Sequence, residues 1–176
     1  FLIRNVQGGL MSSWLQSKAA PGVELQLTGP LGVFYLRKVE RPVLMLAGGT
    51  GLAPFLSMLA TLKESSDDQP VHLIYGVTND ADLVCVEQLE AFAGELNNFT
   101  FKTVIADANS EHPRTGYVTQ HMEDAPLTNG EVDIYLCGPP PMVDAVMKYL
   151  DEQGIEPNSF HYERFTPSAS KEAAAS

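Results

Sequence analysis

The stretch LAGGTGLAPF, residues 46–55, decides the fold of this chain. It follows the apolar run Val43–Leu46, which is typical of a buried parallel strand, and it precedes a helical pattern with an apolar face at 55–62. A strand, a glycine turn and a helix together present bare backbone N–H groups to a phosphate, because glycine lacks a Cβ and a helix N-terminus carries partial positive charge. A nucleotide pyrophosphate is therefore expected at Gly48, Gly49, Thr50 and Gly51. The spacing differs from G-x-G-x-x-G, and an isolated glycine cluster can also be a purely structural turn.

After Pro42 the chain alternates between strand and helix patterns. Apolar segments predict strands at 43–47, 71–77, 99–105, 133–137 and 160–164. Amphipathic segments predict helices at 53–63, 85–93, 118–122 and 142–153. Short connections between apolar strands and helices predict an α/β fold, a five-stranded parallel sheet with helices on both faces.

The segment before Pro42 has a different pattern. Alternating residues predict strands at 1–6, 23–27 and 33–36, and a glycine turn leads into a short helix that ends near Leu15. At the other end, residues 168–176 form a polar, alanine-rich tail that is expected to be disordered.

Composition limits the classes of partner. The chain has 176 residues, a 44% hydrophobic fraction that supports a packed core, and a formal net charge of −11, which disfavours nucleic acid and anionic membranes. Its apolar runs are far shorter than the roughly 20 residues of a membrane span. The cysteines, Cys85 and Cys137, lie far apart and the histidines are scattered, so no metal site is predicted. A cytoplasmic protein with reduced thiols is expected.

Three glycine-bearing or polar segments directly follow predicted strands, at Gly48–Gly51, Gly76–Asp82 and Cys137–Pro141. In an open α/β sheet, ligands bind beyond the carboxyl ends of the strands, where the strand order reverses. The three segments are therefore expected to share one site.

These segments resemble the NAD(P)-binding half of the ferredoxin–NADP reductase superfamily. Among its members, the chain is most similar to the reductase components of aromatic-ring-hydroxylating dioxygenases, of the benzoate dioxygenase reductase type. The resemblance runs in order from about Pro42 to Phe165 and rests on AGGTGLAP at 47–54, YG at 75–76, DL at 82–83, EQL at 87–89, TGYV at 115–118, CGPPPM at 137–142 and ERF at 163–165.

The resemblance implies a flavoprotein reductase domain that passes electrons from NADH through FAD to an iron–sulfur centre for an aromatic-ring dioxygenase. It divides the chain into the tail of an antiparallel FAD-binding β-barrel at 1–41, an NAD-binding domain at 42–167 and the tail at 168–176. The short helix of the barrel would hold the FAD pyrophosphate through Gly8, Gly9, Leu10, Met11, Ser12 and Ser13.

The resemblance also assigns three catalytic positions. Cys137 would lie beside the nicotinamide ring, with Gly138 and Pro139 also binding the cofactor; the alternative is a buried thiol at a strand end. Phe165 would cover the flavin and Glu163 would set the local electrostatics; the alternative is an edge strand with alternating faces.

The segment after the second strand indicates the coenzyme. A 2′-phosphate needs a cation there, yet no Lys or Arg occurs between Lys63 and Lys102. Asp80 or Asp82 would repel that phosphate and could accept a hydrogen bond from a ribose hydroxyl, so NADH is predicted. Asp82 also suits a helix start, which makes Asp80 the better candidate.

The sequence lacks the family's upstream flavin-cradling motif and a cysteine set for an iron–sulfur cluster. The expected partners are therefore the missing N-terminal FAD and iron–sulfur domains, and a ferredoxin domain, or a ferredoxin and a terminal oxygenase. Weak or absent FAD binding and self-association through residues 1–40 are expected, because Leu10, Trp14 and Leu15 lack the strands that would cover them.

The alternative function is an isolated NAD(H)-binding module without catalytic activity. A flavodoxin-like regulatory domain would explain neither glycine segment.

Overall fold

The computed structural model describes residues 1–29, 31–65, 67–123, 125 and 127–165, so the predicted tail at 168–176 lies outside the described residues. The chain forms two compact units, Phe1–Val33 and the remainder from Phe34 onward. Within the described part of the chain, no helix is both long enough and apolar enough to cross a membrane.

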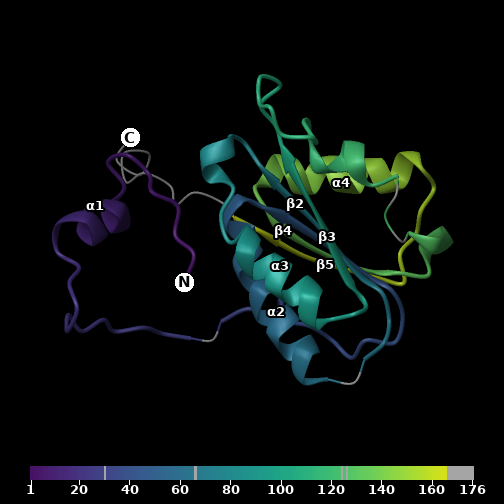
Figure 1. Ribbon diagram of the computed structural model, residues 1–176, viewed down its shortest axis with the longest axis horizontal. Coiled ribbons are helices and arrows are strands. Elements are labelled where there is room, and N and C mark those ends of the chain that lie inside the picture. The colour runs from purple at the N-terminus through teal and green to yellow at the C-terminus, as the bar shows by residue number, and fades with distance from the viewer. Residues whose placement is uncertain (30, 66, 124, 126, 166–176) are drawn as a thin grey trace, which may run out of the picture. The chain divides into compact units, whose positions relative to one another are not determined.

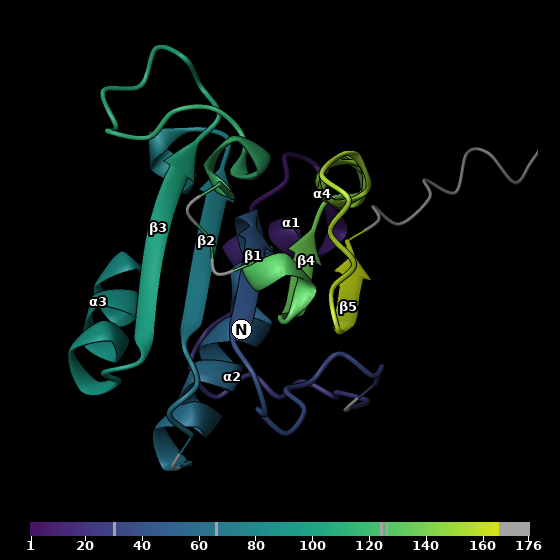
Figure 2. The same ribbon diagram turned by 90° about the vertical axis from the view of Figure 1, so that its right-hand side faces the viewer.

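The second unit is built on a single sheet of five parallel strands, which confirms the predicted fold class. The strands lie in the order β3-β2-β1-β4-β5, as Figure 2 shows. Their bounds are β1 Val43–Gly48, β2 Val71–Val77, β3 Phe99–Ile105, β4 Asp133–Gly138 and β5 Ser159–Arg164. From β1 the chain first adds strands on one side and then crosses to the other, so the strand order reverses between β1 and β4.

Helices cover both faces of the sheet (Figure 1). Helices α2 (Leu52–Glu64) and α3 (Val86–Glu95) lie on one face, and α4 (Pro140–Glu152) lies on the other. Helix α4 begins two residues before the predicted start, because proline is well tolerated in a first helical turn. The segment predicted as a helix at 118–122 is a short 3-10 helix, η3 (Val118–His121).

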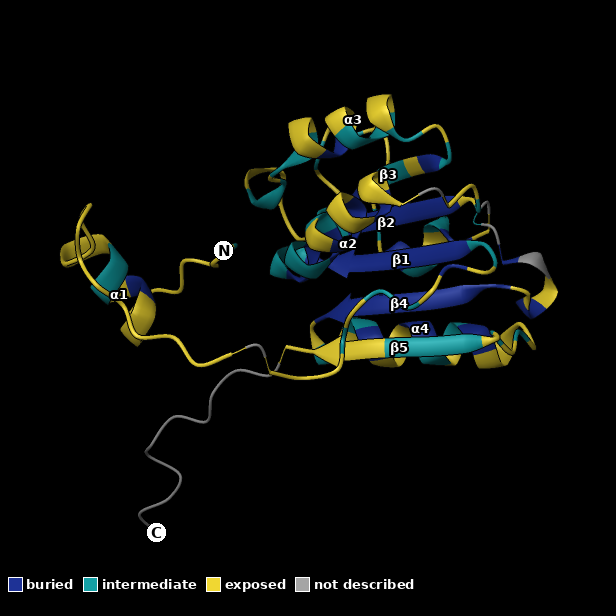
Figure 3. Ribbon diagram, turned by 90° about the horizontal axis from the view of Figure 1, so that it is seen from below, coloured by how far each residue is buried: buried dark blue, intermediate teal, exposed yellow. Residues whose placement is uncertain are grey.

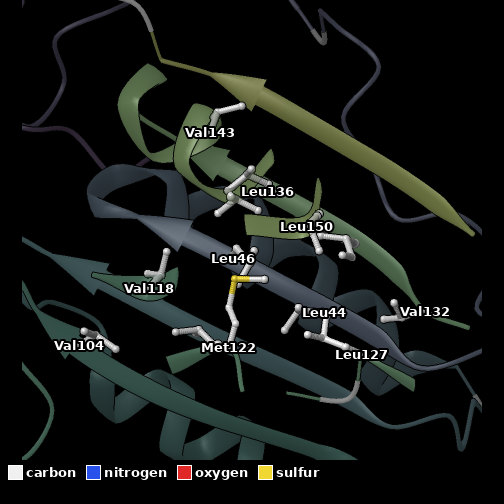
Figure 4. Packing of buried hydrophobic residues seen from close by; sticks show 13 residues of the cluster. Leu44, Leu46, Val104, Val118, Met122, Leu127, Val132, Leu136, Val143 and Leu150 are labelled. Carbon is white, nitrogen blue, oxygen red and sulfur yellow. The ribbon is translucent and has the colours of Figure 1, made fainter. Parts of the chain in front are cut away.

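The central strands are buried on both faces, and Figure 3 shows β1, β2 and β4 almost entirely in dark blue. Between the sheet and α4 lies a cluster of aliphatic side chains (Figure 4). Alternate strand residues such as Leu44 and Leu46 point into this cluster, while their neighbours face α2. The members of the cluster are Leu44, Leu46, Ile74, Val104, Val118, Met122, Leu127, Val132, Ile134, Leu136, Val143, Val146 and Leu150.

The strands predicted at 1–6, 23–27 and 33–36 are wrong: within the described residues of 1–40, none belongs to a strand. A strand needs a neighbour to complete its hydrogen-bond ladder, and no described segment pairs with these three. The short helix is confirmed as α1 (Leu10–Ser17). The side chain of Phe34 instead packs edge-on against Phe55 and Tyr135 in the second unit.

A buried ion pair lies at the amino end of β4. One guanidinium nitrogen of Arg41 lies 3.1 and 3.0 Å from the two carboxylate oxygens of Asp133, whose side chain is 7% exposed. The hydroxyl of Ser159 on β5 donates to the same carboxylate at 2.7 Å. Asp133 therefore ties β4 and β5 to the segment that enters β1.

Replacing Asp133 by alanine should lower the free energy of unfolding by about 2–3 kcal/mol, because the half-buried guanidinium of Arg41 loses its partner. The reduction stays below that of a fully buried pair since the Arg41 side chain is 29% exposed. Chemical denaturation checks the value. Glu40→Ala is the matched control: its carboxylate is exposed, pairs with the exposed Lys38 at 2.8 Å and lies 3.9 Å from Arg41, so its loss should lower the free energy of unfolding far less than the loss of Asp133. Equal effects of the two variants would contradict the prediction.

Candidate functional site

The glycine turn after β1 contains residues with two different structural roles. Gly49 has a φ of +55° and faces open space, since an added Cβ would meet no atom within 4 Å. By contrast, a Cβ on Gly51 would overlap the Cys137 carbonyl, and one on Gly48 would lie 2.8 Å from Cδ of Pro139. Gly48 and Gly51 therefore let two strand ends meet, while Gly49 leaves the backbone N–H groups of the turn accessible.

The strand ends that carry the predicted site are in backbone contact. Ala47 pairs with Cys137 in the ladder between β1 and β4. A Cβ on Gly138 would lie 3.2 Å from the Cα of Gly48. The structure thus brings Gly48–Gly51 together with Cys137, Gly138 and Pro139 at the point where the strand order reverses, the position at which open α/β sheets bind ligands.

Cys137 is fully buried at this point. Burial, reinforced by the negative charge of Glu163, raises the pKa of its thiol to about 12. Its Sγ lies 4.0 Å from Oε2 of Glu163, the residue that pairs with it across β4 and β5. The side chain is therefore a neutral, polarisable group at ordinary pH rather than a thiolate nucleophile.

Glu163 lies near the carboxyl end of β5, beside this thiol, and Phe165 follows the strand. The N–H of Phe165 donates to the carbonyl of Gly138 at 3.0 Å, which continues the pairing one residue beyond the strand. The Phe165 ring is 39% exposed and the Glu163 side chain is also exposed. Arg164, between them, forms an ion pair with Asp144 on α4 at 2.8 Å. Of the two residues predicted from the sequence, Glu163 thus contacts Cys137 and Phe165 contacts the next residue, Gly138.

The acidic segment after β2 begins beside the glycine turn, because Gly76 pairs with Gly48. Asp82 is occupied within its own loop: its carboxylate accepts from the backbone N–H of Asn79 at 3.3 Å and from the Asn79 side chain at 3.1 Å. Asp80 is exposed and accepts a hydrogen bond from the hydroxyl of Ser110 at 2.7 Å. Asp82 is thus engaged within its own loop, whereas Asp80 is exposed and one of its carboxylate oxygens contacts the neighbouring loop.

Sequence reasoning missed two side chains at this edge. Tyr117 is 68% exposed. The next residue, Val118, packs against Gly76 at the end of β2: a Cβ added to Gly76 would lie 2.6 Å from Cγ1 of Val118. Ser110 belongs to a loop that the sequence marks only as polar. The sequence shows an aromatic residue within TGYV and a serine among turn residues. Neither pattern reveals that the residue lies near the end of β2 in the folded chain.

The predicted FAD contacts lie in the first unit, at the start of α1. Gly8 has a φ of +72° with open space at its Cβ position, and Gly9 precedes the first turn of the helix. The hydroxyl of Ser12 accepts from the Val6 N–H at 2.9 Å, so this buried side chain is engaged by its own chain. Leu10, Met11 and Ser13 are exposed in the first turn.

Comparison with known proteins agrees with the geometry of the second unit. Residues 45–148 match the sequence profile of a family described as the oxidoreductase NAD-binding domain. The chain belongs to this family. Its solved relatives have the ferredoxin reductase-like fold: the cytochrome P450 reductase of Amycolatopsis superposes with a TM-score of 0.84 at 34% identity, over 95% of this chain and 52% of that one.

Curated relatives of this NAD-binding domain are parts of oxygenase systems. The electron transfer component of toluate 1,2-dioxygenase from Pseudomonas putida is 56% identical over 96% of this chain and 50% of its own length. The electron transfer component of 2-halobenzoate 1,2-dioxygenase from Burkholderia cepacia is 46% identical over 95% and 50%. The chain spans about half the length of these curated relatives.

The neutral, buried state of Cys137 predicts slow thiol chemistry. At pH 8, a disulfide reagent or iodoacetamide should modify the partly exposed Cys85 first and Cys137 more slowly by at least roughly tenfold, because the thiolate is the reacting form and the Cys137 pKa is raised to about 12. Peptide mapping of the modified protein measures both rates. Raising the pH should accelerate Cys137 up to its pKa. Modification of both thiols at one rate would contradict the assignment.

Proposed function

We propose that this NAD-binding domain is the nicotinamide half of an NADH-dependent flavoprotein reductase, which supplies electrons through FAD and an iron–sulfur centre to an aromatic-ring dioxygenase. The observation that carries the proposal is the pairing of an open glycine turn with a buried, neutral thiol at the switch point of a parallel sheet. The names of the Pseudomonas and Burkholderia relatives support the oxygenase assignment. A ferredoxin domain, or a ferredoxin and a terminal oxygenase, would be the electron-transfer partners.

The pyrophosphate of NADH would bind at Gly49 and Thr50. The positive φ of Gly49 and the open space beside it let a phosphate approach the backbone N–H groups. The following helix α2 adds the partial positive charge of its N-terminus.

The nicotinamide ring would lie at Cys137. A neutral sulfur places no charge against the ring and fits a flat aromatic group by dispersion. The carboxylate of Glu163 lies 4.0 Å from that sulfur, where its negative charge would favour the positively charged, oxidised form of a nicotinamide bound there. The exposed Phe165 would cover the flavin ring until nicotinamide displaces it.

The adenosine half would extend toward β2. Asp80 would accept a hydrogen bond from the ribose 2′-hydroxyl and repel a 2′-phosphate. Tyr117 lies in the segment between β3 and η3, and its exposed ring would offer a stacking surface for adenine.

Flavin binding would involve the first unit. A flavin held there would supply redox chemistry that links two-electron donors to one-electron acceptors. The start of α1 would contact the FAD pyrophosphate through Gly8, Gly9, Leu10, Met11 and Ser13. Ser12 would stabilise the turn before the helix, because its hydroxyl accepts the N–H of Val6.

The chain should bind NADH more tightly than NADPH by roughly 100-fold, because a phosphate beside an exposed carboxylate costs about 2–3 kcal/mol. Calorimetric titration with each nucleotide measures the two dissociation constants. Asp80→Arg should raise NADPH affinity, and Asp82 is left intact because its carboxylate holds Asn79. Equal affinities in the unmodified chain would reject the assignment of NADH.

Gly49→Ala should raise the Kd for NADH by roughly tenfold, or about 1.4 kcal/mol, because the new methyl group would occupy the approach of the phosphate. Gly154→Ala is the matched control: Gly154 follows α4, has a φ of +63° and is also surrounded by open space. Both variants should lose about 1–2 kcal/mol of stability through backbone strain, but only the first should weaken binding. Unchanged NADH affinity in folded Gly49→Ala would assign the turn a purely structural role.

A further inference from the structure

The loops that follow β2 and β3 leave the sheet side by side. Their hydrogen bonding continues past the ends of both strands: the N–H of Ala106 donates to the carbonyl of Val77 at 2.9 Å, and the N–H of Asp107 donates to that of Thr78 at 3.0 Å. The first residues of the two loops are therefore held next to each other by backbone hydrogen bonds.

One side-chain hydrogen bond joins these loops near their tips. The hydroxyl of Ser110 donates to Oδ1 of Asp80 at 2.7 Å. The same hydroxyl accepts the N–H of His112 at 3.0 Å. Because an ionised carboxylate can only accept, the single hydroxyl proton of Ser110 is directed at Asp80 while a lone pair of the same oxygen accepts from His112.

His112 connects this serine to the sheet. Its Nδ1 lies 3.1 Å from the backbone nitrogen of Arg114 and 3.0 Å from the carbonyl oxygen of the same residue, which fixes the ring beside the loop. Nε2 lies 3.0 Å from the hydroxyl of Thr103, a buried residue of β3. The contacts run from Thr103 through His112 and Ser110 to Asp80, from the buried sheet to an exposed carboxylate.

We propose that Ser110 is a positioning residue for coenzyme selection, which holds the Asp80 carboxylate in one orientation before the ribose arrives. The inference rests on the proposed role of Asp80. Among the interactions of the described residues, Ser110 is the side chain that donates a hydrogen bond to this carboxylate, and it engages Oδ1. Oδ2 is left for the 2′-hydroxyl of an adenosine ribose. An exposed aspartate without this contact would lose side-chain freedom only on binding, at a cost in affinity.

The test measures the dissociation constants of NADH and NADPH by calorimetry on the full chain for Ser110→Ala, Ser110→Thr, Asp80→Ala and the Ser110→Ala/Asp80→Ala double variant. Ser110→Ala should weaken NADH by about fivefold, the equivalent of one ordinary hydrogen bond, and should change NADPH less. Ser110→Thr keeps a hydroxyl and should restore NADH affinity. In the Asp80→Ala background, Ser110→Ala should have no further effect.

Ser65→Ala is the matched control. Its hydroxyl bonds the carbonyl of Leu62 at 3.0 Å at the end of α2, so its loss should leave both dissociation constants unchanged. Thermal unfolding of every variant separates loop damage from positioning.

Three results would overturn the inference. If Asp80→Ala abolishes the preference for NADH but Ser110→Ala does not weaken NADH, Ser110 does not position the carboxylate and the proposed role of Asp80 stands. If Ser110→Ala weakens NADH equally with and without Asp80, or weakens both nucleotides while lowering the melting temperature, its role is structural. If Asp80→Ala leaves the preference intact, Asp80 does not select the coenzyme and the proposed function loses that assignment.

Discussion

Backbone contact between the carboxyl ends of β1 and β4 is the constraint on which the rest of this structure depends. Side chains at Gly48, Gly51 and Gly138 would force the two strand ends apart, because each added Cβ meets atoms of the opposing segment. Because these positions are glycines, backbone atoms of the two strands meet directly at the point where the strand order reverses. The turn that carries Gly49 thus begins two residues after Ala47, which pairs with Cys137, and returns at Gly51 to the Cys137 carbonyl.

The same close packing determines the chemistry available at the site. Cys137 is buried because it ends a central strand, and burial keeps its thiol protonated. Pairing of β4 with β5 places the carboxylate of Glu163 within 4.0 Å of that sulfur and aligns Phe165 with Gly138. Parallel strand pairing thus sets a neutral group, an acid and an aromatic ring in a fixed relation without a dedicated loop.

The proposed coenzyme selection would depend on a separate part of the same sheet. The ladder between β2 and β3 extends beyond both strands, so the acidic loop and the serine-bearing loop keep a constant spacing. Asp82 and Tyr75 stabilise the acidic loop that follows β2. The Tyr75 hydroxyl donates to the Asp82 carbonyl at 3.4 Å, and the Asp82 carboxylate accepts the N–H of Asn79. Asp80 is thereby left exposed at a defined place on the carboxyl edge of the sheet, at the strand beside the glycine turn.

The sequence by itself determined the local elements of the second unit: apolar runs specified its strands, amphipathic runs its long helices, and the glycine turn the edge where a ligand would bind. It could not determine pairing, because a ladder partner can lie anywhere in the chain. For that reason the strands expected at 1–6, 23–27 and 33–36 do not form, whereas the weakly patterned β5 does, alongside β4. Only the tertiary structure decided that Ser110 meets Asp80 and that Cys137 is buried beside Glu163, because hydrogen bonding and desolvation act between segments that folding brings together.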